Sequence, residues 1–125
     1  MKPSEVSNIP QRVNLILYAG DGVALRLTAT NAENGNSLDL AGELKAQVKV
    51  KRADPEPLVE FTINTDQAAE GILDLFLTGE QTSELFADGK QFKGAWDVQW
   101  LADGEEPRTL VQGSVICDLD VTRRP

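Results

Sequence analysis

The side chains best suited to ligand binding in this 125-residue chain are its only two tryptophans, in the stretch WDVQW (96–100). In a β-strand, Trp96 and Trp100 project from one face with Val98 between them. Two exposed rings about 13 Å apart, at about 3.3 Å per residue, would suit stacking on successive sugars of a glycan. The alternative is that the three side chains form one wall of a core, with Asp97 and Gln99 facing solvent. The polar residues opposite favour the core, because burial of a large side chain is worth roughly 1.5–3 kcal/mol.

Carboxylates are the second group that could do chemistry. Asp118 and Asp120 face the same side of a strand, and GEE (104–106) adds acid at a loop. Calcium requires oxygen ligands that converge from loops, and no EF-hand spacing is present. Glycoside hydrolysis requires two carboxylates across a cleft, but among 20 acidic residues such a pair arises by chance. We therefore predict a solvated acidic face, with no metal site and no catalytic residues.

Histidine is absent, and this excludes most nucleophilic enzymes. Without it, neither a serine nor a cysteine has its usual activating base, and a zinc site of the Cys/His type cannot form. The single cysteine, Cys117, lies in the strand-like run SVICDLDV and is interpreted as a small buried apolar residue rather than a reactive thiol. We expect a protein that is not an enzyme and has no cofactor.

The charge balance limits the classes of partner. A net charge of −8 opposes binding to nucleic acid or to an anionic membrane surface, and it fits a basic partner or bound cations without requiring either. No stretch approaches the roughly 20 apolar residues that cross a bilayer. The first residues, MKPSEVSNIPQR, contain no apolar signal region, so we expect synthesis and folding in a cytoplasm.

Seven short runs separated by turn formers have the alternation or composition of β-strands. They span residues 12–18, 23–30, 43–51, 58–65, 72–77, 92–101 and 108–121. One short helix is predicted within 78–89, because Thr78 and Gln81 have the spacing of a capping box. No helical crossovers alternate with the strands. The sequence therefore predicts an all-β fold, an antiparallel immunoglobulin-like β-sandwich of about seven strands with one short helix.

The inward faces of these strands supply the predicted core. Its residues are Leu25, Leu27, Val48, Phe61, Leu75, Trp96, Val98, Trp100 and Val115. We expect one domain over residues 12–122, preceded by a polar N-terminal arm (1–11) and followed by a basic tail (123–125). These ends are either frayed, or they are arms that order on a neighbouring protein and close its sheet edges. Asp97, Gln99, Arg123 and Arg124 are the candidate interface residues.

The order of motifs carries a family resemblance. Residues 13–49 contain a strand, a Gly-Asp turn, a second strand, a polar turn, the corner LDLAG (38–42) and an alternating strand. Residues 60–85 follow with a strand, the turn DQAAEG, another strand and the helix start TGEQT. WDVQW and RTLVQGSVICDLDVTR then form a closing hairpin. In this order the chain resembles the LtfC-like β-sandwich domains of virion and fibre proteins of tailed phages, especially of actinobacterial hosts. Ala41 stands where that family usually has threonine.

The resemblance covers about residues 12–123 and brings no catalytic residues with it. It implies a structural role in the virion, either docking on tail or head proteins or presentation at the host surface. A more distant resemblance to the N-terminal domain of phage baseplate upper proteins implies attachment as well. Since no fibre is fused to the domain, we expect a minor tail or head decoration protein.

The sequence thus predicts a non-enzymatic bacteriophage virion protein, made in the bacterial host cytoplasm and located in the virion. Its expected partners are other virion proteins and further copies of itself, with no nucleic acid and no membrane. The alternative function is a host-surface glycan-binding module of the virion.

Overall fold

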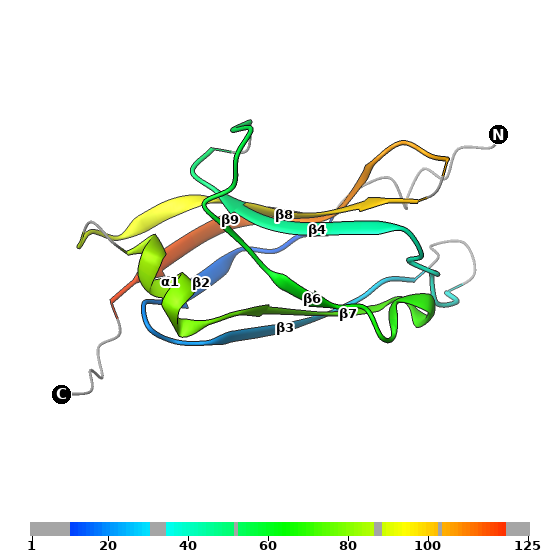
Figure 1. Cartoon of the computed structure of the whole chain (residues 1–125), viewed down its shortest axis with the longest axis horizontal. Coiled ribbons are helices and arrows are strands. Elements are labelled where there is room, and N and C mark those ends of the chain that lie inside the picture. The colour runs from blue at the N-terminus through cyan, green and yellow to red at the C-terminus, as the bar shows by residue number, and fades with distance from the viewer. Residues whose placement is uncertain (1–10, 31–34, 52, 87–88, 103, 120–125) are drawn as a thin grey trace.

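Residues 11–30, 35–51, 53–86, 89–102 and 104–119 are described by a computed structural model of the chain. Two β-sheets stack face to face, and a short helix lies at one end of the sandwich (Figure 1). The elements in chain order are β1 (Gln11–Arg12), β2 (Leu15–Tyr18), β3 (Val23–Thr28), β4 (Glu43–Lys49), β5 (Val59–Glu60), β6 (Thr62–Asn64), the 3-10 turn η2 (Ala68–Glu70), β7 (Ile72–Leu77), α1 (Gly79–Leu85), β8 (Phe92–Leu101) and β9 (Arg108–Asp118). The predicted β-sandwich is confirmed.

The strands divide into a six-stranded and a three-stranded sheet. The larger sheet has the order β1-β9-β8-β4-β5, and β2 also pairs with β9, beyond β1 along the same edge. The smaller sheet has the order β3-β7-β6. All seven predicted runs form strands, but two of them are divided. The run 12–18 becomes β1 and β2, and the run 58–65 becomes β5 and β6.

The second division carries the chain from one sheet to the other at Phe61. β5 pairs with β4 in the larger sheet, whereas β6 pairs with β7 in the smaller one. Between them, buried Phe61 donates its backbone N–H to the Ala46 carbonyl at 2.8 Å. Its ring centroid lies 5.7 Å from that of Trp96. One continuous extended segment therefore links the two layers through the core.

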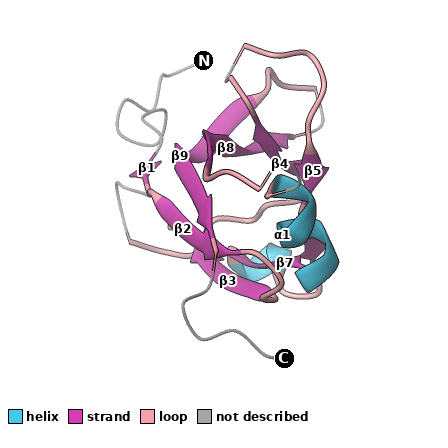
Figure 2. Cartoon of the chain, turned by 90° about the vertical axis from the view of Figure 1, so that its left-hand side faces the viewer, coloured by secondary structure: helices cyan, strands magenta, loops and turns pink. Residues whose placement is uncertain are grey.

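The sandwich is antiparallel, as predicted, except at one edge of the larger sheet. β1 and β2 pair with β9 in parallel, with Leu15 opposite Val115. A parallel pair requires a long connection, and here almost the whole sandwich lies between the two strands. The first and last strands consequently lie side by side in the larger sheet (Figure 2).

Seven of the nine predicted core residues are buried. They are Val48, Phe61, Leu75, Trp96, Val98, Trp100 and Val115. The predicted burial is wrong for Leu25 and Leu27, which are only partly buried, although they pack against the core. β3 is an edge strand of the smaller sheet, so one flank of each side chain stays open. Val50 is about half exposed, because β4 ends one residue earlier.

The interruption between β1 and β2 packs closely on β9 at Gly113. The Val13 carbonyl accepts a hydrogen bond from the indole N–H of Trp96 at 2.7 Å. The Asn14 side chain accepts one from the backbone N–H of Ser114 at 3.0 Å. A Cβ at Gly113 would overlap the Val13 carbonyl oxygen. Glycine is required here because the two backbones approach each other directly.

Helix α1 begins with the predicted capping box and is anchored by a buried hydroxyl. The Thr78 hydroxyl accepts from the Gln81 backbone N–H at 3.1 Å, and the Gln81 side chain accepts from the Thr78 N–H at 2.9 Å. One turn further on, the Thr82 hydroxyl accepts from the Gly20 N–H at 3.0 Å and donates to the Asp21 carbonyl at 2.9 Å. These bonds fix the helix to the turn that follows β2.

Candidate functional site

Both tryptophans of β8 point into the core. Trp96 is 2% exposed and Trp100 is 5% exposed. The indole N–H of Trp100 donates to the Ala41 carbonyl at 2.9 Å, and the Arg108 guanidinium lies 5.5 Å from its ring centroid. Buried rings whose N–H groups are already bonded offer no face to a sugar. The stacking platform considered from the sequence is therefore absent at these two residues.

The candidate interface residues Asp97 and Gln99 lie on the outer face of the larger sheet. Asp97 stands opposite Gln47 of β4, and Gln99 stands opposite Lys45. Gln99 is exposed, whereas Asp97 is partly exposed. Their placement agrees with the alternation of WDVQW, in which the intervening residues are buried. The pair belongs to a polar, solvent-facing surface.

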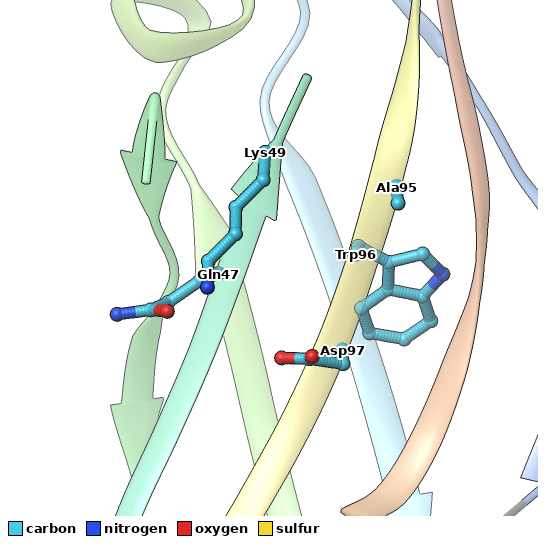
Figure 3. A pocket seen from close by; sticks show the side chains of 5 residues that line it. All are labelled: Gln47, Lys49, Ala95, Trp96 and Asp97. Atoms are coloured by element: carbon cyan, nitrogen blue, oxygen red, sulfur yellow. The ribbon is translucent and has the colours of Figure 1, made fainter. Parts of the chain in front are cut away.

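Beside Asp97 this surface has a shallow depression between β4 and β8 (Figure 3). The small side chain of Ala95 leaves room there between longer neighbours. The depression is lined by Gln47, Lys49, Ala95, Trp96 and Asp97. It offers an amide, an ammonium and a carboxylate as hydrogen-bonding groups, on an open surface rather than in an enclosed cavity.

Several sequence-predicted features lie outside the described residues. These are Arg123 and Arg124 of the candidate interface, the tail 123–125, Asp120 and nearly all of the arm 1–11. The described fold begins with Gln11, which pairs with Val111 of β9. The proposal that the ends act as arms therefore stays a prediction.

The single thiol and its neighbouring carboxylate have structural partners. Cys117 is fully buried, and its thiol lies 3.5 Å from the Thr82 carbonyl. Burial, with a smaller contribution from Asp118, raises the pKa of this thiol, so it stays protonated. Hydrogen bonds from the Leu119 backbone N–H at 2.8 Å and from the Gln91 side chain at 2.9 Å lower the pKa of Asp118.

An ion pair joins Arg26 of β3 to Asp74 of β7. It is bidentate, with Nε–Oδ1 at 2.8 Å and Nη2–Oδ2 at 3.0 Å. The hydrogen bond from Arg26 lowers the pKa of Asp74. Both side chains lie on the outer face of the smaller sheet, where exposed ion pairs contribute little to stability.

The described ranges contain neither a cluster of metal ligands nor a membrane-spanning helix. Among the described residues, no group of three or more Cys, Asp and Glu side chains lies close enough to hold a metal ion. No described helix is long and apolar enough to span a bilayer. Within these ranges the acidic side chains are spread over the surface rather than gathered into a ligand set.

An apolar patch on β2 was missed by the sequence analysis. Leu15 and Leu17 are buried, whereas Ile16 is 65% exposed and Tyr18 is 42% exposed on the outer face. Ile16 stands opposite the partly exposed Ile116 of β9. We call Ile16, Tyr18 and Ile116 the β2 edge patch. The available signal was the run LILY, which is apolar on both faces of the strand.

No protein-family model and no curated protein matches the chain. Among solved structures, Tim-1 matches with a TM-score of 0.50 and 13% sequence identity, over 93% of this chain and 100% of that one. A chain of a crystal structure of ICOS in complex with ICOS-L and an anti ICOS-L VNAR domain matches with a TM-score of 0.48 and 11% identity, over 89% of this chain and 56% of that one. At such low identity the likeness to Tim-1 shows the fold alone. The fold is an immunoglobulin-like β-sandwich, as the strand pattern predicted.

Proposed function

We propose that the chain is a non-enzymatic structural protein of a tailed-phage virion, a minor tail or head decoration protein that docks on other virion proteins. The phage assignment rests on the resemblance of residues 12–123 to LtfC-like domains. The docking role is carried by one structural observation, the β2 edge patch. It places two large apolar side chains of an edge strand in solvent.

The patch is unusual because soluble sandwiches normally protect their edges with charge, proline or short strands. The other edges here follow that rule. β5 has two residues and follows Pro55 and Pro57, and β6 has three residues. β3 carries Arg26, paired with Asp74, at its centre. β2 is longer than β5 and β6, with four residues, and contains neither charge nor proline; Ile16 is its most exposed residue. An apolar edge of this kind suits burial against another protein.

The non-enzymatic part of the proposal is supported by the state of the ionisable groups. Cys117 is buried with a raised thiol pKa, whereas nucleophilic catalysis requires an accessible thiolate. Asp74 and Asp118 have lowered pKa values, because both accept hydrogen bonds that favour the ionised form. A general acid at neutral pH requires the opposite shift.

The glycan-binding alternative no longer has an aromatic platform to support it, because both tryptophans are buried. With Trp96 and Trp100 buried, a sugar would be left with the polar depression beside Asp97. Glycan sites combine a few polar groups with apolar or aromatic walls, and the exposed lining here is polar except for Ala95.

Virions purified from the phage that encodes the chain provide the test. Mass spectrometry should find the protein in density-banded particles, in a fixed ratio to the major tail or capsid protein. Its consistent absence from intact particles would refute the virion role. In the same preparations, deletion of residues 1–10 should leave a folded domain by circular dichroism but abolish incorporation. Normal incorporation of this deletion variant would refute the arm hypothesis.

A pull-down of the purified full-length protein on host cell walls separates the two functions. The docking proposal predicts no retention, whereas the alternative predicts retention that free host glycan displaces. An Asp97→Ala variant that loses such retention without unfolding would assign the activity to the depression and favour the alternative.

A further inference from the structure

The outer edge of β2 presents backbone hydrogen-bonding groups to solvent. Val13 and Ala19 each donate a backbone N–H to a carbonyl of β9 at 2.9 Å. The backbone N–H and C=O groups of the odd-numbered residues in this segment therefore point toward β9. Because these directions alternate along a strand, the N–H and C=O of Ile16 point away from β9. Within the described ranges, β9 is the only strand that pairs with β2. An uncovered edge of this kind is a template for one more strand.

We propose that this edge pairs with β2 of a second copy of the chain, antiparallel, about a two-fold axis at Ile16. The pairing joins two six-stranded sheets into one continuous sheet. It rests on the docking part of the proposed function, and it names a second copy of the chain as the virion protein that covers the β2 edge patch. About this axis Ile16 and the partner's Ile16 form a hydrogen-bonded pair, with Cα atoms about 5.5 Å apart.

The side chains of β2 are self-complementary in this arrangement. Ile116 and Ile16 are neighbours on the outer face, so the axis places four isoleucines in one apolar row across the interface. Lys93 lies opposite Ile116 on β8 and closes the row at each end. Asn14 stands opposite the partner's Tyr18, and no like charges face each other. Apolar cross-strand pairs of this kind each contribute roughly 0.2–1 kcal/mol.

The absence of charge from β2 allows a second β2 to be the partner. The chain carries −8 overall, yet Leu15–Tyr18 contains no charged residue, so two copies meet where neither contributes charge. A partner strand for this edge must be extended, uncharged and apolar on its outer face. β2 itself has all three properties.

The affinity should be modest and should rise with salt. A four-residue strand pair is a small interface, so we expect a Kd in the micromolar range, about 1–100 µM. Like net charge on the two copies opposes association, and added salt screens it. Raising the salt from about 0.05 to about 0.5 M should therefore tighten the dimer, by about threefold or more.

Sedimentation equilibrium of the full-length protein tests the pairing. The wild type should shift from 13.6 kDa toward twice that mass, 27.2 kDa, as its concentration increases to about 500 µM. Ile16→Lys places two ammonium groups at the axis and should weaken the dimer by about tenfold or more. The matched control is Leu58→Lys, which changes another exposed apolar residue, near the opposite edge of the same sheet, and should leave the dimer intact.

A cysteine cross-link keeps the test decisive even where Ile16→Lys perturbs folding. Ile16→Cys should form an intermolecular disulfide under mild oxidation, because the expected Cα separation lies within disulfide range. The wild type should not cross-link, since its only cysteine is fully buried. A monomer at all salt concentrations, equal disruption by Leu58→Lys, or no cross-link would each overturn the pairing. A monomer that still enters virions would refute the pairing alone, whereas a dimer absent from virions would refute the virion role alone.

Discussion

Replacing Gly113 with alanine tests the close contact between β9 and the β1–β2 interruption. The added Cβ would lie 2.6 Å from the Val13 carbonyl carbon and would overlap its oxygen. Both are backbone atoms, so no side-chain rotation relieves the clash, and the first strands must lift from β9. Forcing extra volume into a packed site costs about 1–3 kcal/mol. The same movement breaks the bond from the Trp96 indole and leaves a buried donor unpaired, at about 1–3 kcal/mol.

We therefore expect Gly113→Ala to lower the free energy of unfolding by about 2–6 kcal/mol, a large share of the 5–15 kcal/mol typical of a domain. Urea titration followed by tryptophan fluorescence measures this directly, because both indoles are buried in the folded state. The matched control is Gly22→Ala, whose Cβ would meet the Leu77 carbonyl oxygen at an ordinary 3.7 Å. This control should stay within about 0.5 kcal/mol of the wild type.

A double-mutant cycle with Trp96→Phe locates the origin of the effect. Both substitutions act on the Val13 carbonyl, so their combined loss should be smaller than the sum of the single losses. A Gly113→Ala protein within about 0.5 kcal/mol of the wild type would refute this reasoning. Strict additivity of the two substitutions would refute the shared contact.

Three further predictions concern single side chains. Thr82→Val removes the acceptor of the Gly20 N–H and should cost about 1–3 kcal/mol in urea unfolding, and a neutral effect would contradict the buried bond. Arg26→Gln removes the hydrogen bond that lowers the pKa of Asp74, so a carbon NMR titration should show that pKa rising toward its ordinary value, and an unchanged pKa would contradict the pairing. A carboxyl whose pKa is lower in the folded state stabilises the fold above its unfolded pKa, and this contribution is lost as the pH falls through the folded pKa. Below about pH 4 the wild type should therefore lose more stability than Arg26→Gln. Native Cys117 should react with a thiol reagent only on unfolding, because burial shields it and raises its pKa, and mass spectrometry would detect faster labelling.

Local sequence patterns predicted the helix and strands well, because these elements are set largely by residues close together in the sequence. The capping box at Thr78 and Gln81 sets the start of α1 through two bonds between residues three apart. The alternation of WDVQW separated the buried Trp96 and Trp100 from the solvent-facing Gln99 without knowledge of the partner strands.

Features that depend on distant segments could not be predicted in this way. The change of sheet at Phe61 depends on which neighbours β5 and β6 find, and no residue in LVEFTINT marks it. The register of β8 on β9 shifts after Val98, where Leu110 is an extra residue, and strict alternation misses such a bulge. Likewise, the exposure of Ile16 follows from the position of β2 at a sheet edge, which the composition of the strand does not specify.

The parallel pairing of β2 with β9 also sets an order of events during synthesis. Leu15 cannot pair with Val115 until Val115 has been synthesised. At about 5–20 residues per second, the roughly one hundred residues between them take about 5–20 s to translate. Throughout that interval the nascent chain carries an uncharged apolar strand, β2, whose native partner β9 has not yet been translated or is still in the exit tunnel of the ribosome. We expect this segment to be the main site of chaperone protection and of misfolding on the polysome. The first two strands of the larger sheet to be synthesised, β1 and β2, are thus among the last to reach their place.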